Sequence, residues 1–162
     1  MKQTKIHLLI IPALAILFFD QITKLLIIRS FRIYESLVVV EGFFNIVHVR
    51  NRGMAFGFLN RSEAETAFYF LLFATIAAVV LILLWAWKLK SSEIGMILGL
   101  SFIIGGAMGN LVDRIRLREV IDFLDFHIGS FHWPAFNVAD SAITIGTFWV
   151  AIHLLFHRTP SS

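Results

Sequence analysis

Cysteine is absent from this chain of 162 residues. Disulfides, thiol nucleophiles and thiolate metal sites are therefore excluded, and the chain cannot itself carry a lipid on a cysteine. Charged residues are also scarce, at 15% of the sequence, whereas 58% of the residues are hydrophobic. A soluble domain of this length rarely has such a composition, so we predict an integral membrane protein with a single compact domain over residues 1–162.

Long basic runs are absent too, although the formal net charge is +3. Without such a run the chain has no stripe of cations to follow a phosphate backbone, so we expect no nucleic-acid partner and assign the positive charge to contact with membrane lipid.

The common hydrolase motifs are missing as well. There is no HExxH motif, and His153 and His157, although spaced i,i+4, lie at the opposite end of the predicted bundle from the acidic residues. Ser101, in GLSF, lacks the glycine-flanked turn and the neighbouring base of a serine nucleophile. We therefore expect no metal, no cofactor and no serine catalysis.

Four apolar stretches are long enough to cross a membrane, since a hydrocarbon core of about 30 Å needs roughly 20 helical residues. We predict an all-α membrane protein with four transmembrane helices. No small-x-small cleavage site follows the first stretch, so we expect it to be retained. The predicted spans are about 7–28, 67–87, 94–112 and 137–157.

The connections between the spans differ in character. An even number of spans places both termini on one side and residues 29–66 and 113–136 on the other. In the first of these segments the runs SLVVV and FFNIVHV, separated by EG, predict a small β-rich segment over about 31–49 at the membrane surface.

A count of basic residues gives one expectation about the orientation of the bundle. A positive-inside count would make the side with residues 29–66 and 113–136 cytoplasmic. That side carries eight arginines, at positions 29, 32, 50, 52, 61, 114, 116 and 118, against five basic residues on the other, at 2, 5, 88, 90 and 158.

Polar residues interrupt the apolar stretches, and each has a structural and a functional interpretation. A charge at mid-bilayer costs about 2.5 to 3.5 kcal/mol. On the structural interpretation, these residues form an ion pair along one helix, caps at helix ends, and a first-turn acid stabilised by the helix dipole. The groups are Asp20 with Lys24, then Asn110, Asp113 and Arg114, then Asn137 with Asp140, and Asp122 lies alone between Ile121 and Phe123.

All of these groups fall on the same side of the predicted bundle, so Asp20, Asp113, Asp122 and Asp140 can converge. Two adjacent carboxyls do not both ionise easily, and such a pair can activate water against a peptide bond. The alternative is a small transporter or ion-coupled bundle, for which polar residues spread through the membrane's depth would be typical.

Five motifs in order resemble those of the lipoprotein signal peptidase family, also called signal peptidase II, over essentially the whole chain. They are DQITK at 20–24, RNRGMAFGFL at 50–59, GGAMGNLVDRI at 105–115, EVIDFLDF at 119–126 and PAFNVADSAITIG at 134–146.

The resemblance implies an aspartyl endopeptidase that removes the signal peptide from diacylglyceryl-modified prolipoproteins, just before the modified cysteine. It implies a monomer in the bacterial inner membrane with cytoplasmic termini, and an active site near the extracytoplasmic face. Arg52 and Met54 depart from the small residue and alanine that the family often has there. The implied catalytic pair is Asp122 and Asp140, supported by Asp20, Lys24, Asn51, Gly53, Asn110, Asp113, Arg114 and Asn137.

Overall fold

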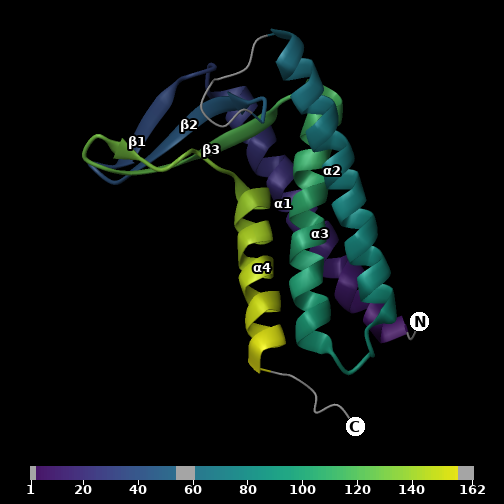
Figure 1. Ribbon diagram of the computed structural model, residues 1–162. Helices are drawn as coiled ribbons and strands as arrows, with labels where there is room; N and C mark the ends of the chain where they lie inside the picture. Colours follow the sequence, from purple (N-terminus) through teal and green to yellow (C-terminus); the bar gives the residue numbers. More distant parts are fainter. Residues whose placement is uncertain (1–2, 54–60, 157–162) are drawn as a thin grey trace.

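The computed structural model describes residues 3–53 and 61–156, with the side chains of 61–64 left out. Within these residues it has four long helices, all apolar enough to span a membrane, and a four-stranded sheet at one end of the bundle (Figure 1). The all-α membrane fold with a small β-rich part is thus confirmed. The helices are α1 (Gln3–Ser30), α2 (Arg61–Lys88), α3 (Ile94–Leu117) and α4 (Val138–Phe156).

Helix α3 is the centre of the bundle and packs against α1, α2 and α4. Its glycines allow this. A Cβ atom added at Gly105 would lie 2.7 Å from the carbonyl oxygen of Ala13 in α1, and one added at Gly106 would collide with the carbonyl of Ala139 in α4. These small residues therefore allow a close approach of the helices, which brings the start of α4 against the bundle's most buried helix.

The sheet is antiparallel, with the strand order β1-β2-β3-β4. The predicted sheet over 31–49 is confirmed as the β1–β2 hairpin, but the prediction was incomplete, because β3 and β4 come from the segment 113–136. This matters because β3 carries Asp122. The strands are β1 (Ser36–Val40), β2 (Phe44–Asn51), β3 (Val120–Ile128) and β4 (Phe131–His132).

The third helix extends beyond the predicted span, which was drawn to end at residue 112. Asp113 and Arg114 lie inside α3, because the polar residues after the apolar run still favour a helix. The helix ends where Arg118 adopts a left-handed conformation (φ 59°) and its N–H donates to the carbonyl of Arg114.

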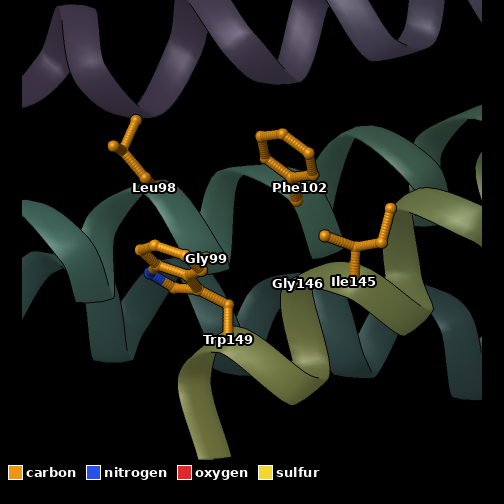
Figure 2. A pocket seen from close by; sticks show the side chains of 6 residues that line it. All are labelled: Leu98, Gly99, Phe102, Ile145, Gly146 and Trp149. Carbon is orange, nitrogen blue, oxygen red and sulfur yellow. The ribbon is translucent and has the colours of Figure 1, made fainter. Parts of the chain in front are cut away.

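An apolar groove of about 270 Å³ lies between α3 and α4, and none of the residues that line it is charged (Figure 2). Gly99 and Gly146 form its floor, since a Cβ on Gly146 would lie 2.7 Å from the carbonyl oxygen of Gly99. Trp149 lines one side, and its indole N–H donates to the carbonyl of Gly95 at 2.9 Å. The groove is part of the close α3–α4 contact.

Candidate active site

Asp122 and Asp140 come from different elements, and Asn137 joins them. Asp122 lies on β3 and Asp140 in the first turn of α4. The Asn137 side-chain amide donates to Asp122 Oδ1 at 2.7 Å, and its backbone N–H donates to Asp140 Oδ2 at 3.3 Å. The two acids that were predicted as a pair are thus held by one residue.

Asn137 and Asp140 also form a reciprocal helix cap. Asn137 Oδ1 accepts the backbone N–H of Asp140 at 2.9 Å, while Asp140 Oδ2 accepts that of Asn137. The other oxygen of Asp140 accepts an N–H of Asn110 at 2.7 Å. Asp140 is therefore the first-turn acid that its structural interpretation predicted, and it also lies within the polar cluster.

Asp122 is 2% exposed and accepts two side-chain hydrogen bonds. Asn51 donates to its Oδ2 at 3.0 Å, and Asn137 donates to its Oδ1. Burial, with a smaller contribution from the charge of Asp140, raises the pKa of Asp122 to about 6 against the opposing effect of these hydrogen bonds. Asp122 therefore binds a proton much more readily than an exposed carboxylate does.

Lys24 is a buried cation of the same polar cluster, at 2% exposed. Its ammonium lies 2.8 Å from Asp20 Oδ2 and 2.8 Å from Asp113 Oδ2, and it donates to Asn110 Oδ1 at 3.0 Å. The i,i+4 pairing of Asp20 with Lys24 is as the spacing predicted. The third contact links this ion-paired group to Asp140, because Asn110 binds both.

The two carboxylates on Lys24 hold the backbone on either side of the site. Asp20 Oδ1 accepts the N–H of Ala139, in the first turn of α4, at 2.9 Å. Asp113 Oδ2 accepts the N–H of Ile121, next to Asp122, at 3.3 Å. The polar groups on α1 and α3 therefore position the chain at both acids.

Gly53 and Arg114 complete the predicted set. Gly53 has φ +81° and donates its N–H to Asn51 Oδ1 at 2.7 Å, which orients the amide that binds Asp122. A Cβ added at Gly53 would also collide with Leu71. The half-buried Arg114 interacts electrostatically with Asp140, Asp113 and Asp122.

A cavity of about 700 Å³ opens beside Asp122 and is lined on one side by Arg50, Asn51 and Arg52. Glu119 closes part of its mouth, with Oε1 2.7 Å from Arg52 Nε and Oε2 3.6 Å from Arg50 Nη1. The departure from the family pattern at Arg52 is therefore at the mouth of this cavity. Met54 and the rest of that motif, 54–59, lie outside the described residues.

Two contributing residues were not singled out from the sequence. Gln21 donates to Asp113 Oδ1 at 3.0 Å and to Asp20 Oδ2 at 3.2 Å, so it binds both partners of Lys24. Glu119 holds the two arginines at the cavity mouth. Both lie inside quoted motifs, and that is the only signal that the sequence offers for them. Of the two histidines considered as metal ligands, His157 is outside the described part of the chain.

Comparison with known proteins identifies the family. The profile of the family described as signal peptidase (SPase) II matches residues 12–156. The chain belongs to the signal peptidase II family. A lipoprotein signal peptidase of Syntrophus aciditrophicus (strain SB) is 46% identical over 91% of this chain and 92% of its own length. Another, of Oleidesulfovibrio alaskensis, is 48% identical over 86% of this chain and 88% of its own length.

Solved structures agree with this assignment. A bacterial membrane enzyme determined by the in meso method at 1.9 Å resolution matches with a TM-score of 0.80 and 34% identity, over 91% of this chain and 92% of its own. A second bacterial membrane enzyme, at 2.3 Å, matches with a TM-score of 0.80 and 32% identity, over 94% of this chain and 92% of its own. A signal peptidase II is a protease, so this chain is an integral membrane protease, and the transporter alternative loses its support.

Proposed function

We propose that the chain removes signal peptides from bacterial prolipoproteins, cutting just before the diacylglyceryl-modified cysteine, with Asp122 and Asp140 as its acid and base. The names of the relatives support the substrate class. The observation that carries the catalytic assignment is Asn137, which binds both carboxyl groups. One of the two, that of Asp122, lines a cavity.

In the proposed reaction one carboxyl is ionised and the other is protonated, as expected for neighbouring acids. The ionised member takes a proton from water as the water oxygen bonds to the carbonyl carbon of the scissile peptide. The protonated member donates its proton to the leaving nitrogen as the C–N bond breaks. The raised pKa of Asp122 supports its role as the proton holder, although the two acids titrate as a pair.

The substrate has a helix and acyl chains in the membrane and a peptide outside it, and the fold suits this division. The cavity beside Asp122 lies where the helices meet the sheet, and all five residues of β1 are exposed, three of them valines. We infer that the sheet forms a cradle over the lipid-bearing end of the substrate. The protein would act as a monomer in the inner membrane, with its site at the extracytoplasmic face and both termini in the cytoplasm.

The decisive experiment incubates purified protein with a diacylglyceryl-modified prolipoprotein and, separately, with its unmodified form. We expect cleavage of the modified form alone. Asp122→Asn and Asp140→Asn should each abolish cleavage while the protein still inserts, and Asp125→Asn is the matched control on the same strand because Asp125 binds Asn45 and His132 instead. Cleavage retained by either dyad variant would exclude the proposed pair. Cleavage of both substrates would exclude the lipid specificity.

A further inference from the structure

A second cavity, of about 710 Å³, lies at the end of α1 that faces the sheet. We propose that this basic pocket binds the phosphate group of an anionic phospholipid. Its wall consists of residues 28–33, which are the last three residues of α1 and the three that follow it, together with Glu35, His48 and Arg50. Three of these residues are arginines, at positions 29, 32 and 50.

The pocket has more positive than negative charge. Its single acid, Glu35, accepts the backbone N–H of Arg32 at 2.6 Å. Among the side chains that the structure describes, in 3–53 and 65–156, no carboxylate lies within ion-pair distance of the Arg29 or Arg32 guanidinium. Arg50 has one long contact of 3.6 Å to Glu119, and its Nε is buried without an acceptor in the described part of the chain. Several guanidinium donors are thus left for an anion.

Hydrogen bonds hold the floor of the pocket in place. His48, 2% exposed, has its Nδ1 2.9 Å from the carbonyl oxygen of Phe31, which requires Nδ1 to carry the proton. Its backbone donates to the carbonyl of Glu35 at 3.0 Å and accepts the N–H of Tyr34 at 2.8 Å. The segment that carries Arg32 is therefore fixed against β2 before any ligand binds, which lowers the entropic cost of binding.

The position of the pocket indicates that the phosphate belongs to a lipid headgroup. Arg29 lies in the last turn of a membrane-length helix. Ile33, in the wall of the pocket, and its neighbour in the chain, Tyr34, are 45% and 79% exposed. Exposed apolar and aromatic residues beside arginine are typical of the headgroup level of a bilayer. A zwitterionic headgroup would place its own ammonium near the arginines, so an anionic phospholipid fits better than phosphatidylcholine.

This site accounts for part of the charge that contradicts the positive-inside rule. Arginines that bind a headgroup are retained for a local contact, and so they report no orientation. Arg50 lines both this pocket and the cavity beside Asp122, so a bound headgroup would lie next to the proposed active site. The proposal itself does not depend on peptide cleavage.

The test measures lipid selectivity. Purified protein is reconstituted in phosphatidylcholine vesicles, and electron paramagnetic resonance gives the association constants of spin-labelled phosphatidylglycerol and spin-labelled phosphatidylcholine. We expect the wild type to prefer phosphatidylglycerol several-fold. The double variant Arg29→Gln/Arg32→Gln should lose most of this preference, through a several-fold fall in the association constant for phosphatidylglycerol while that for phosphatidylcholine stays unchanged.

The control variant Arg116→Gln/Arg118→Gln removes two arginines from the same end of the protein, at residues that do not line the pocket. Its selectivity should remain that of the wild type, and so should that of Asp140→Asn. Equal losses in both arginine pairs would reduce the effect to general surface charge and overturn the proposal. A wild type without preference for phosphatidylglycerol would also overturn the proposal, and this measurement does not depend on how well the variants fold. Displacement of the lipid by inorganic phosphate, with no effect of chloride at equal ionic strength, would assign the pocket to free phosphate instead.

Discussion

At the scale of single residues, Asp122 gives the clearest prediction of pH dependence. Its pKa is raised to about 6, so the folded protein binds this proton more tightly than the unfolded chain, and the stability of the folded state falls as the pH rises from about 4 to 7. Asp122→Asn removes this titration, and its melting temperature in detergent should change less over that range. Between pH 4 and 7, the change in the free energy of unfolding should differ between the wild type and Asp122→Asn by about 1 to 3 kcal/mol.

Asp125, three residues along β3, is the control of opposite sign. Although partial burial acts against it, hydrogen bonds from His132 and Asn45 hold the pKa of Asp125 below its usual range. Its contribution to stability is present at neutral pH and is lost as the pH falls through that lowered pKa. Asp125→Asn should therefore leave the fall between pH 4 and 7 unchanged. Parallel curves for Asp122→Asn and the wild type would contradict the burial argument.

How much of the site the sequence predicts also differs residue by residue. The i,i+4 spacing is enough to pair Asp20 with Lys24, and the Asn137–Asp140 spacing places both on one helix face. No periodicity predicts that Asn110 contacts both Lys24 and Asp140, because that contact depends on how three helices pack. The roles of Asn51 and Gly53 came from the family resemblance alone.

At the scale of elements, the start of α4 combines a helix cap with part of the proposed active site, and Asn137→Ala tests both. Loss of the cap costs about 1 kcal/mol, and Asp122 and Asp140 lose the residue that they share. We expect a lower melting temperature together with a large loss in kcat. Thr147→Ala, which removes a hydrogen bond to the Ile143 carbonyl in the middle of the same helix, should change neither strongly. Full activity in Asn137→Ala would show that Asn137 does not position the acids.

Strand β3 shows where prediction of elements from sequence fails. In the β1–β2 hairpin, β1 has a run of three valines, β2 is rich in β-branched residues, and a turn lies at Gly42 (φ 72°), so local pattern is sufficient. In β3 the apolar run is broken by Asp122 and Asp125, which in isolation indicate a polar loop. The strand forms because β2 pairs with it and because Asp113 binds the N–H of Ile121. The pairing with β2 joins segments distant in sequence, and the contact of Asp113 depends on where α3 ends.

At the scale of the whole molecule, the proposed orientation can be measured directly because the chain has no cysteine of its own. Lys90→Cys lies in the turn between α2 and α3, and Ser130→Cys lies in the turn between β3 and β4; both positions are exposed. A thiol reagent that does not cross membranes should label position 130 in intact cells. It should label position 90 only after the membrane is opened. Labelling of position 90 from outside would reverse the orientation.

The buried ion-paired group around Lys24 couples the elements into one structure. Through Asp20 it holds the start of α4, and through Asp113 it holds β3, so the loss of its charge acts on the whole site. Lys24→Met leaves two buried carboxylates without their cation, and we expect a loss of about 3 to 5 kcal/mol in the free energy of unfolding.

Lys5 is the matched control, because it is also buried in α1, at 3% exposed. Among the residues that the structure describes, it binds only the neutral carbonyls of Trp87 and Leu89. Lys5→Met should cost clearly less than Lys24→Met, about 1 to 3 kcal/mol, since no buried charge is left unpaired. Adding Asp20→Asn to Lys24→Met should recover part of the stability, because it removes one of the two unpaired carboxylates. Denaturation of the purified variants in detergent measures all three effects. If Lys24→Met proved as stable as Lys5→Met, the polar cluster would be a set of local contacts and not the connection between the helices, the strand and the two acids.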